Sequence, residues 1–394
     1  MASTMTATGS MEATRFEKPG ELKISASPTS TACSTLDLLV EFRSVSGSEG
    51  SSDGGTEVPV QEVERCIQGC LREASDSVGD FAEADLRLVK TLQRAERNQG
   101  CVDLMEDLAG GQFAVKKMPT AWITKSHEEF CETHGNFGER PWFDVATVKY
   151  LQSKGFTYLC RHIGIFRDDL NTYVVSDLAS EGDAFTWCTR GPSPCPAREG
   201  AVSPVFRQLC SATAWLHDLG IAHQDISLEN VLLHKDPETG AMHVKLIDFG
   251  MATAERYTNH VCGKPSYQAP EMHVEEGHLY DGFRADVFAL GVCLFALALK
   301  DYPWMSTKPG QCKKFEAYYA LGLRDYLLRR KAPRSQSPMI SVLSTDLLEL
   351  LEGLLDTNPQ QRVTLGESCW EAPADADGAE PVRVWDMSWM VMWQ

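Results

Sequence analysis

The sequence of 394 residues predicts an α+β fold in which strands come before helices along the chain. Three segments near the start of the predicted domain carry strand signals, at residues 86–90, 101–105 and 112–116. A hairpin is predicted at residues 231–247, where two apolar runs flank the turn sequence D-P-E-T-G. The apolar run at residues 287–299 is typical of a helix that is buried on every side.

The N-terminal part is predicted to lie outside this domain. Residues 1–55 are rich in Ser, Thr and Gly, and they hold too little apolar surface to offset the entropy of the chain. We therefore expect residues 1–83 to be mostly disordered, with one short amphipathic helix at residues 59–74 that rests on the domain without a function of its own. Apolar residues near helical spacing predict this helix, namely Val60, Val63, Ile67 and Leu71.

The composition indicates which partners and which cellular compartment to expect. The net charge of −18 disfavours nucleic acid or an anionic membrane as the main partner and mildly favours basic substrates. The 13 cysteines include no C-x-x-C pair, which favours a reducing compartment, the cytoplasm or the nucleus, over a disulfide framework or a zinc site. We expect no membrane insertion, because the apolar run at 287–299 is too short to span a bilayer.

The ends of the predicted hairpin carry the candidate chemistry. Asp225 and Asn230 precede its first strand, and Asp248 follows its second. Two carboxylates and an amide are hard oxygen ligands, which suit Mg²⁺ together with the oxygens of a substrate phosphate. The hairpin is therefore expected to bring these three residues to one point.

These residues lie in two recognisable motifs. The sequence H-Q-D-I-S-L-E-N at 223–230 resembles the catalytic loop H-R-D-L-K-P-E-N of eukaryotic protein kinases, and D-F-G at 248–250 resembles their metal-binding triplet. The resemblance implies a two-lobed kinase domain at residues 84–372, with a small β-rich N-lobe at 84–178 and a larger helical C-lobe at 179–372.

The resemblance assigns roles at the centre of the site. Asp225 is expected to accept or steer the proton of the substrate hydroxyl, and Asn230 and Asp248 are expected to hold Mg²⁺. Lys116 ends the segment F-A-V-K, which matches V-A-I-K, and is expected to clamp the α- and β-phosphates of ATP.

The acid that pairs with Lys116 has two candidates. A helix is predicted at residues 143–151, after a connection longer than is usual in the family. In kinases this helix offers a Glu to the lysine. The best register places Asp144 there, and Glu139 is the alternative.

The nucleotide cleft departs from the family in its glycine loop. Residues 95–102 keep only Gly100 of the three glycines, so the grip on phosphate is expected to be weaker or differently arranged. The remaining adenine-site positions match the family: Val102 and Ala114 above the ring, Leu232 below it, Ser176 as the gatekeeper, and the backbones of Asp177 and Ala179 at the hinge.

Two positions depart from the family together. Ser227 stands where the catalytic loop usually carries a lysine, and Lys264 stands where G-K-P-S-Y-Q-A-P-E usually carries a hydroxyl residue. In related kinases these side chains touch, so we hypothesise that the ammonium and hydroxyl groups have exchanged sides and that Lys264 steadies the transferring phosphoryl group. The alternative is that Lys264 points to solvent.

The chain departs from the family at the position that usually pairs with a phosphate on the activation segment. Gln224 replaces the arginine that in many kinases binds a phosphate on this segment, which spans residues 248–271. Phosphorylation of Tyr257 or Thr258 would therefore find less to pair with, and activity is not expected to depend strictly on it.

Other matches imply structural roles. Glu271 and Arg362 resemble the buried pair that fixes the C-lobe. Asp286 matches the acid that anchors the catalytic loop from the apolar helix, and His223 and Phe249 match members of the apolar column that joins the lobes.

The substrate type follows from the same resemblance. L-E-N and P-S-Y-Q-A-P-E look like Ser/Thr kinases, which implies a protein substrate. Asp183 and Glu229 match positions where basophilic kinases hold a substrate arginine, with the alternative that they are acids at helix starts. Residues 186–203 are expected to be a loop, and residues 205–217 to be the helix that leads to the catalytic loop.

The tail at residues 373–394 ends in an aromatic pattern. Trp385, Trp389 and Trp393 recur every four residues, which makes a stripe if the tail is helical. The tail is expected to dock on the lobes, to bind a partner, or to be unstructured.

The function expected from the sequence is transfer of the ATP γ-phosphate to protein Ser/Thr. The alternative is a pseudokinase scaffold that binds nucleotide and signals through protein contacts. The depleted glycine loop supports this alternative, as do Asp144, Gln224 and Ser227.

Overall fold

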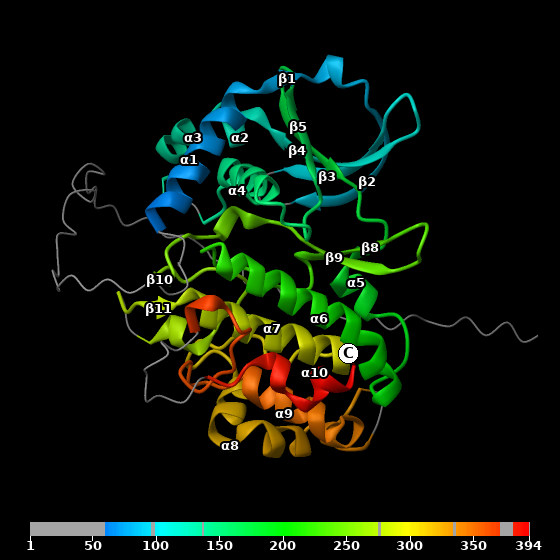
Figure 1. The fold of residues 1–394 in the computed structure, drawn as a ribbon, viewed down its shortest axis with the longest axis vertical. Coiled ribbons are helices and arrows are strands. Elements are labelled where there is room, and N and C mark those ends of the chain that lie inside the picture. The colour runs from blue at the N-terminus through cyan, green and yellow to red at the C-terminus, as the bar shows by residue number, and fades with distance from the viewer. Residues whose placement is uncertain are drawn as a thin grey trace, which may run out of the picture. The chain divides into compact units, whose positions relative to one another are not determined.

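The computed structural model describes residues 60–95, 99–135, 138–274, 277–333, 336–370 and 381–393. It confirms the α+β, two-lobed architecture, with a β-sheet lobe above a helical lobe (Figure 1). The disorder that we expected at residues 1–59 lies outside the described residues.

The N-lobe is built on a six-stranded sheet with the order β1-β5-β6-β4-β3-β2. Its strands are β1 Val78–Asp80, β2 Arg87–Ala95, β3 Gly100–Glu106, β4 Gln112–Pro119, β5 His162–Arg167 and β6 Asn171–Asp177. The three predicted N-terminal strands are confirmed as β2, β3 and β4. Strand β1 was not predicted, and it pairs in parallel with β5 at the edge of the sheet.

The folded N-lobe begins earlier than predicted, at helix α1 Val60–Asp76. Its buried apolar stripe of Val63, Ile67, Leu71 and Ala74 packs against helix α4 Pro141–Ser153. The amphipathic helix predicted at residues 59–74 is therefore confirmed, and the expectation of a mostly disordered extension is wrong for residues 78–83, where β1 and η1 form. The amphipathic stripe becomes ordered because α4 covers it, a tertiary contact that composition does not reveal.

The long connection before α4 is not an open loop. It holds α2 Thr120–Ile123 and α3 His127–His134, and Ser126 caps α3 by accepting a hydrogen bond from Glu129 N. The buried Trp142 indole donates to Ile123 O at 2.9 Å, which ties this connection to the first turn of α4.

The C-lobe is mostly helical. Its helices are α5 Ala184–Cys188, α6 Pro196–Asp218, α7 Gly282–Leu299, α8 Lys313–Arg329, α9 Thr345–Leu354 and α10 Ser388–Met392. Among the described helices, α7 alone has the length and composition of a membrane span, and it is completely buried inside the protein. This confirms that the apolar run is a core helix.

The predicted loop at residues 186–203 is wrong over much of its length, because α6 already begins at Pro196. A proline fits the first turn of a helix, where its missing N–H would have no partner. Pro204 lies inside α6, and the neighbouring Val202 and Val205 are buried. Packing of this face overrides the breaker signal that the prolines provide.

Several short strands and 3-10 helices complete the described fold. The predicted hairpin is present as β8 Val231–Lys235 and β9 Met242–Leu246, with β7 Gly182–Asp183 beside β8. Strands β10 Tyr257–Thr258 and β11 Tyr280–Asp281 form a separate pair. The 3-10 helices are η1 Phe81–Ala84, η2 Phe249–Met251, η3 Pro270–His273, η4 Met339–Val342, η5 Ser368–Trp370 and η6 Val384–Asp386.

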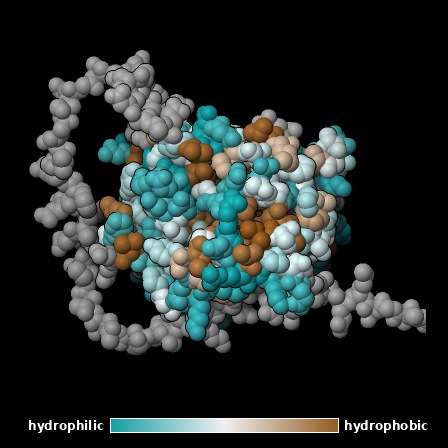
Figure 2. All heavy atoms as spheres, turned by 90° about the horizontal axis from the view of Figure 1, so that it is seen from below, coloured by the Kyte–Doolittle hydropathy of each residue, from teal (hydrophilic) through white to brown (hydrophobic). Residues whose placement is uncertain are grey.

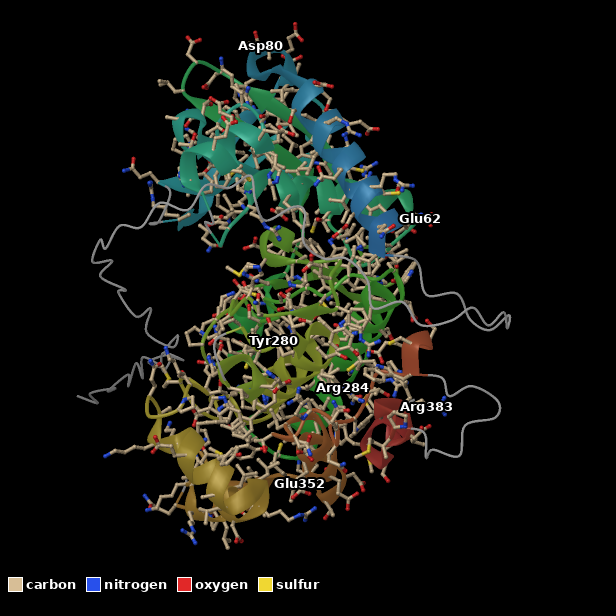
Figure 3. The ribbon with its side chains drawn as sticks, turned by 90° about the vertical axis from the view of Figure 1, so that its left-hand side faces the viewer. Glu62, Asp80, Tyr280, Arg284, Glu352 and Arg383 are labelled. Carbon is tan, nitrogen blue, oxygen red and sulfur yellow. The ribbon has the colours of Figure 1, made fainter. Side chains whose placement is uncertain are left out.

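The described tail docks on the C-lobe. It is not one helix, because Met387 is extended between η6 and α10, so the predicted single stripe does not form. Trp389 is buried and donates from its indole to Glu199 Oε2 at 3.0 Å, and its ring meets that of Phe206 edge-on. Figure 3 shows Arg383 of the tail at the side of the C-lobe.

Figure 2 shows the helical end of the C-lobe from below, where hydrophilic side chains surround separate apolar ones. On α8, Tyr319 and Leu328 are exposed. Single exposed apolar residues of this kind are ordinary on a protein surface.

Candidate active site

The catalytic loop is held from below by the buried helix α7. Asp286 accepts hydrogen bonds from the backbone N–H groups of His223 at 2.7 Å and Gln224 at 2.9 Å. Asp286 is only 1% exposed, so these charge-assisted bonds are shielded from water. The predicted anchor is present, and it sets the direction in which Asp225 leaves the loop.

The hairpin brings the three oxygen-bearing residues together. The amide of Asn230 donates from Nδ2 to both the backbone O and Oδ2 of Asp225, each at 2.8 Å. Ile247 N donates to Asn230 O at 3.1 Å, so the following residue, Asp248, lies beside Asn230. Because Nδ2 of Asn230 is used by Asp225, its Oδ1 is the atom left for a cation.

Asp248 adopts a left-handed backbone conformation, with φ of 66°. Residues without a glycine's freedom seldom occupy this region, and those that do cluster at functional sites. A hard-oxygen pair of Asn230 and Asp248 fits Mg²⁺, which takes few protein ligands when a nucleotide supplies phosphate oxygens.

Lys116 forms the ion pair that the first register predicted. Its Nζ lies 3.4 Å from Asp144 Oδ2, and Asp144 Oδ1 accepts a hydrogen bond from Phe249 N at 2.8 Å. Asp144 therefore ties strand β4, helix α4 and the D-F-G segment together. Glu139 is not the ion-pair partner, but its charge adds to the field on Lys116.

The charges of this cluster depend on one another. Burial lowers the pKa of Lys116, but Asp144, Asp248 and Glu139 outweigh it and hold the pKa above its ordinary value. Burial raises the pKa of Asp144 in spite of Lys116. For Asp248, burial is outweighed first by Lys116 and then by Lys264, so its pKa is lowered and the carboxylate stays charged.

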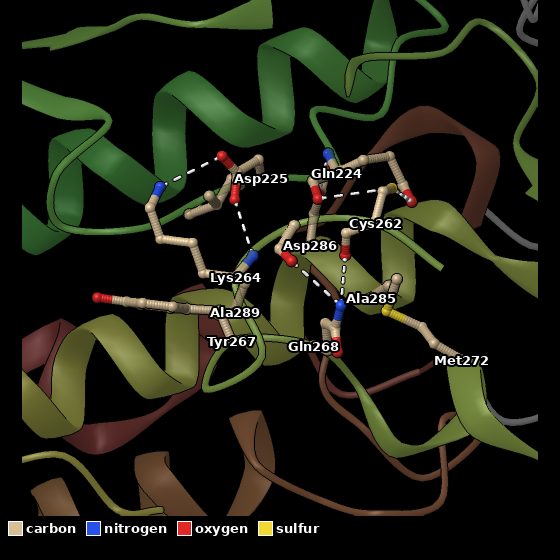
Figure 4. Close-up of a pocket in the computed structure, with 12 residues that line it drawn as sticks. Gln224, Asp225, Cys262, Lys264, Tyr267, Gln268, Met272, Ala285, Asp286 and Ala289 are labelled. Carbon is tan, nitrogen blue, oxygen red and sulfur yellow. Dashed lines mark hydrogen bonds and ion pairs between the residues drawn. The ribbon is translucent and has the colours of Figure 1, made fainter. Parts of the chain in front are cut away.

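Lys264 points at the catalytic loop and not into solvent, so that alternative is wrong. Its Nζ lies 2.8 Å from Ser227 Oγ. It also lies 3.2 Å from Asp225 Oδ2, a contact that Figure 4 shows. Its backbone N also donates to Asp225 Oδ1 at 3.1 Å. The ammonium–hydroxyl contact expected from the paired substitutions is therefore formed.

Gly263 permits this approach. Its φ is +78°, and a Cβ there would lie 2.6 Å from Gln224 O. Any larger residue would push the activation segment away from the catalytic loop, and Lys264 would move with it.

Gln224 is turned inward. Its Oε1 accepts from the Tyr280 hydroxyl at 2.6 Å, and its Nε2 donates to Gly282 O at 3.4 Å. The residue is buried, with 7% of its surface exposed. It holds the base of the activation segment through neutral hydrogen bonds.

Sequence reasoning missed Arg140. Its guanidinium donates to Gly250 O at 3.1 Å and to Ala252 O at 2.6 Å, which joins the start of α4 to the activation segment. These partners are more than a hundred residues away in sequence, and no local pattern marks such a contact.

The two candidate phosphorylation sites differ in access. Tyr257 is 58% exposed, whereas Thr258 is 4% exposed and pairs with Tyr280 across β10 and β11. Arg256 is already paired with Asp281 at 2.9 Å.

The predicted adenine-site residues lie on strands β3, β4, β6 and β8. Val102 and Ala114 are half-buried on β3 and β4, and Ser176 Oγ donates to Ala114 O at 3.3 Å. Leu232 is half-buried on β8, in register with Asp183.

The hinge and glycine-loop residues are placed as follows. Asp177 ends β6, with its carboxylate 3.3 Å from Arg161, and Ala179 is 8% exposed two residues later. Gly100 is buried at the start of β3. Residues 96–98 of the glycine loop lie outside the described part of the chain.

The two candidate substrate acids have different partners. Asp183 Oδ1 accepts from Thr186 N at 2.6 Å and caps α5, as the helix-start alternative predicted. Glu229 is different, because its Oε2 is buried without a hydrogen-bond partner among the described residues. A buried acceptor of this kind favours a cationic ligand.

The structural contacts that the family resemblance implied are also present. Arg362 donates to both carboxylate oxygens of Glu271, at 2.6 and 3.0 Å, inside the C-lobe. The rings of His223 and Phe249 are fully buried with centroids 4.8 Å apart.

A family model and several known proteins match this chain. A family model described as the protein kinase domain matches residues 99–372. Serine/threonine-protein kinase kin-29 of Caenorhabditis elegans is 32% identical over 171 residues, which cover 42% of this chain and 20% of kin-29. CBL-interacting serine/threonine-protein kinase 13 of Arabidopsis thaliana is 30% identical over 226 residues, which cover 56% of this chain and 40% of that protein.

A third relative, serine/threonine-protein kinase PLK4 of Drosophila grimshawi, is 33% identical over 205 residues, 51% of this chain and 24% of that protein. The chain thus spans less than half the length of each of these relatives. The matched domain nevertheless covers most of this chain and contains the whole site described above. The chain belongs to the protein kinase family.

Proposed function

We propose that this chain is an active protein Ser/Thr kinase that uses Mg²⁺ and ATP. The observation that carries the proposal is the state of Asp225, whose carboxylate is held by Asn230 Nδ2 at 2.8 Å and Lys264 Nζ at 3.2 Å. A scaffold that had lost turnover would not need to keep this acid oriented beside a magnesium-type pair. The three relatives described above are all named serine/threonine-protein kinases.

Each residue has a defined task in this proposal. Asp225 orients the substrate hydroxyl and takes or steers its proton, and Lys116 holds the nucleotide phosphates against the N-lobe sheet. Asn230 and Asp248 would hold Mg²⁺, which offsets negative charge on the phosphates when it is bound. Kinase catalysis is mostly positioning and electrostatics, so these residues suffice.

Lys264 supplies the cation that the catalytic loop lacks. Its ammonium lies between Ser227 and Asp225, and a protein substrate would present its hydroxyl next to Asp225. A fixed positive charge at this place stabilises the charge that develops on the transferring phosphoryl group.

Phosphate transfer to a generic protein substrate, with magnesium and ATP, tests the function. Asp225→Asn is expected to lower turnover by about 10²- to 10⁴-fold, because proton steering is lost. Asp236→Asn is the matched control, since this acid lies in the exposed turn of the β8–β9 hairpin and should leave turnover unchanged. A wild-type chain that binds ATP without transferring phosphate would instead support the pseudokinase scaffold, which the depleted glycine loop favours.

We also propose that the substrate is basic near the phosphorylated residue. The buried, unpartnered Glu229 Oε2 and the net charge of −18 support this. On a peptide array, Glu229→Gln should remove a preference for arginine, whereas Asp183→Asn, which keeps the helix cap, should change it less. A preference for acidic or proline-directed peptides in the wild type would contradict the proposal.

A further inference from the structure

The C-terminal tail, which lies beyond the matched kinase domain, is bonded to a segment that follows Arg362. Val384 N donates to Thr364 O at 2.8 Å, and Thr364 N donates to Val382 O at 2.9 Å. The Trp385 indole donates to Leu365 O at 2.6 Å.

The tail also covers the turn that leads to a buried acid, Glu367. Gly366 has φ of +75°, and a Cβ there would lie 3.2 Å from Arg383 Cδ and 3.5 Å from Trp385 Cδ1. Leu365 N donates to Glu367 Oε2 at 2.9 Å. The tail therefore fixes the backbone from which Glu367 enters the C-lobe.

Glu367 continues the chain of contacts to a buried histidine. Its Oε1 lies 2.7 Å from His217 Nδ1, and His217 Nε2 lies 3.2 Å from Asp286 Oδ2. The three side chains are at most 2% exposed, and the His217 ring stacks on Phe283 with centroids 4.1 Å apart. Burial alone lowers the pKa of His217, but the hydrogen bonds and charges of Asp286 and Glu367 raise it to about 9.

Asp286 is the acid that holds the catalytic loop. The oxygen that faces His217, Oδ2, also accepts from His223 N at 2.7 Å, and Oδ1 accepts from Gln224 N at 2.9 Å. Hydrogen bonds and ion pairs thus link the Trp385 indole to the loop that carries Asp225, by way of Leu365, Glu367, His217 and Asp286.

We propose that the C-terminal tail positions the catalytic loop through Glu367, the His217 imidazolium and Asp286, an inference that rests on the kinase activity proposed above. The doubly protonated ring donates to one carboxylate on each side and so fixes the orientation of Asp286. When the ring loses a proton, it can donate to only one of them. Two buried carboxylates then face a neutral ring, and Asp286 is free to turn from the loop amides.

Two acids and one nearby arginine are the charged groups around this histidine in the described part of the chain. Asp286 faces it from α7 and Glu367 faces it from the turn after Thr364. Arg284, also on α7, donates to Arg362 O and adds positive charge near Glu367. The residues of the relay are positioning residues, because none of them is placed to touch a substrate.

Trp385→Phe tests the first link, since it keeps the ring and removes the N–H that Leu365 O accepts. The kcat is expected to fall by about 3- to 30-fold, the usual range for coupling through a packed network, while the KM for ATP stays unchanged. Asp386→Asn is the matched control, because this acid forms an exposed pair with Arg383 on the same tail segment, and its kcat should equal that of the wild type.

The pH profile of kcat supplies a second readout when it is measured under conditions in which each variant stays folded. The kcat of the wild type should decline as pH rises through about 9, where His217 loses its proton. Glu367→Gln should move this decline to lower pH, because one of the two stabilising charges is gone. Wild-type kcat and a wild-type profile in both Trp385→Phe and Glu367→Gln would overturn the proposal.

A measurement without substrate separates this inference from the proposed function. The His217 ring nitrogens can be titrated by NMR in the full chain, and Trp385→Phe should change their titration whereas Asp386→Asn should not. An inactive wild type would overturn the kinase proposal alone. An unchanged His217 titration in Trp385→Phe would overturn the relay alone.

Discussion

Two buried clusters of this protein each hold a cation close to two carboxylates, and they differ in their access to water. In the cleft cluster, Lys116 pairs with Asp144, and Asp248 adds to the field on its ammonium. The sealed cluster consists of His217, Asp286 and Glu367. The Lys116 side chain is 30% exposed, whereas the His217 side chain is not exposed at all.

The difference in exposure indicates which cation can bind a ligand and which one only stabilises the structure. A cation that still faces a cleft can exchange its protein partners for the phosphates of a ligand. One that is sealed between carboxylates can only hold the elements that carry them, here α6, α7 and the segment before the tail. Lys264 belongs with the first kind, because its side chain is 37% exposed and lies next to Asp225.

The largest expected effect is at the cleft cluster. Lys116→Met should lower turnover by about 10³-fold or more, because the fixed charge that holds the phosphates is lost. Lys117→Met is the matched control, since Lys117 is the next residue on β4 and lies over the Tyr173 ring, outside the cleft cluster. Steady-state phosphate transfer measures both, and equal losses in the two variants would show that β4, and not the Lys116 charge, is responsible.

The second-largest effect is expected at Lys264, whose ammonium group contacts Ser227 of the catalytic loop. Lys264→Ala should lower turnover by about 10²-fold, because the positive charge beside Asp225 is lost. Adding Ser227→Lys should restore part of the turnover, because the new lysine places a positive charge at the same contact from the catalytic loop. The measurement is kcat at saturating ATP for the single and double variants. Intact turnover in Lys264→Ala, or no rescue in the double variant, would exclude the exchange.

A smaller effect is expected on stability at the sealed cluster. The folded-state pKa of His217, about 9, is raised above its usual value of about 6.5. The cluster therefore contributes stability that is fully present below about pH 6.5 and is lost as pH rises through about 9. Glu367→Gln should flatten this part of the pH dependence of thermal unfolding.

Glu352→Gln is the control for that experiment, because it changes the same residue type in an exposed pair with Arg324 on the C-lobe. Its unfolding temperature should follow the wild-type pH dependence. A flat wild-type profile between pH 7 and 9 would mean that His217 carries no extra charge in the folded state.

The smallest effect is expected from phosphatase treatment. Gln224 is bonded to Tyr280, and Arg256 is paired with Asp281, so the activation segment is held without a phosphate. Turnover before and after treatment should agree within about twofold. Complete loss of activity on dephosphorylation would show that a phosphate on this segment is required.

Most of the site could be predicted because its residues lie in short motifs. Asp225 and Asn230 are five residues apart on one loop, and the hairpin that follows brings Asp248 back by local pairing. The N-lobe strands were likewise visible as short apolar segments. Local hydrogen bonding and the alternation of apolar and polar residues determine these features, and both depend on residues that are close together in the sequence.

The errors have different physical origins. Residues 78–83 were left in the mostly disordered extension and residues 196–203 were assigned to a loop, yet β1 pairs with β5 and α6 starts at a proline. The tail was expected to form a single stripe if helical, but Met387 is extended and two short helices dock separately. Strand β1 depends on pairing with the distant β5, whereas the start of α6 follows the ordinary preference of proline for the first turn of a helix.

The sequence by itself determined the family, the two lobes and the identity of Lys116, Asp225, Asn230 and Asp248, since each of these depends on residues that are close along the chain. Only the tertiary structure decided that Asp144 and not Glu139 pairs with Lys116, that Lys264 turns toward Asp225, and that the tail reaches the catalytic loop through His217. Charges and hydrogen bonds act across a few ångströms of space, and which groups come that close is settled by packing between segments that the sequence keeps far apart.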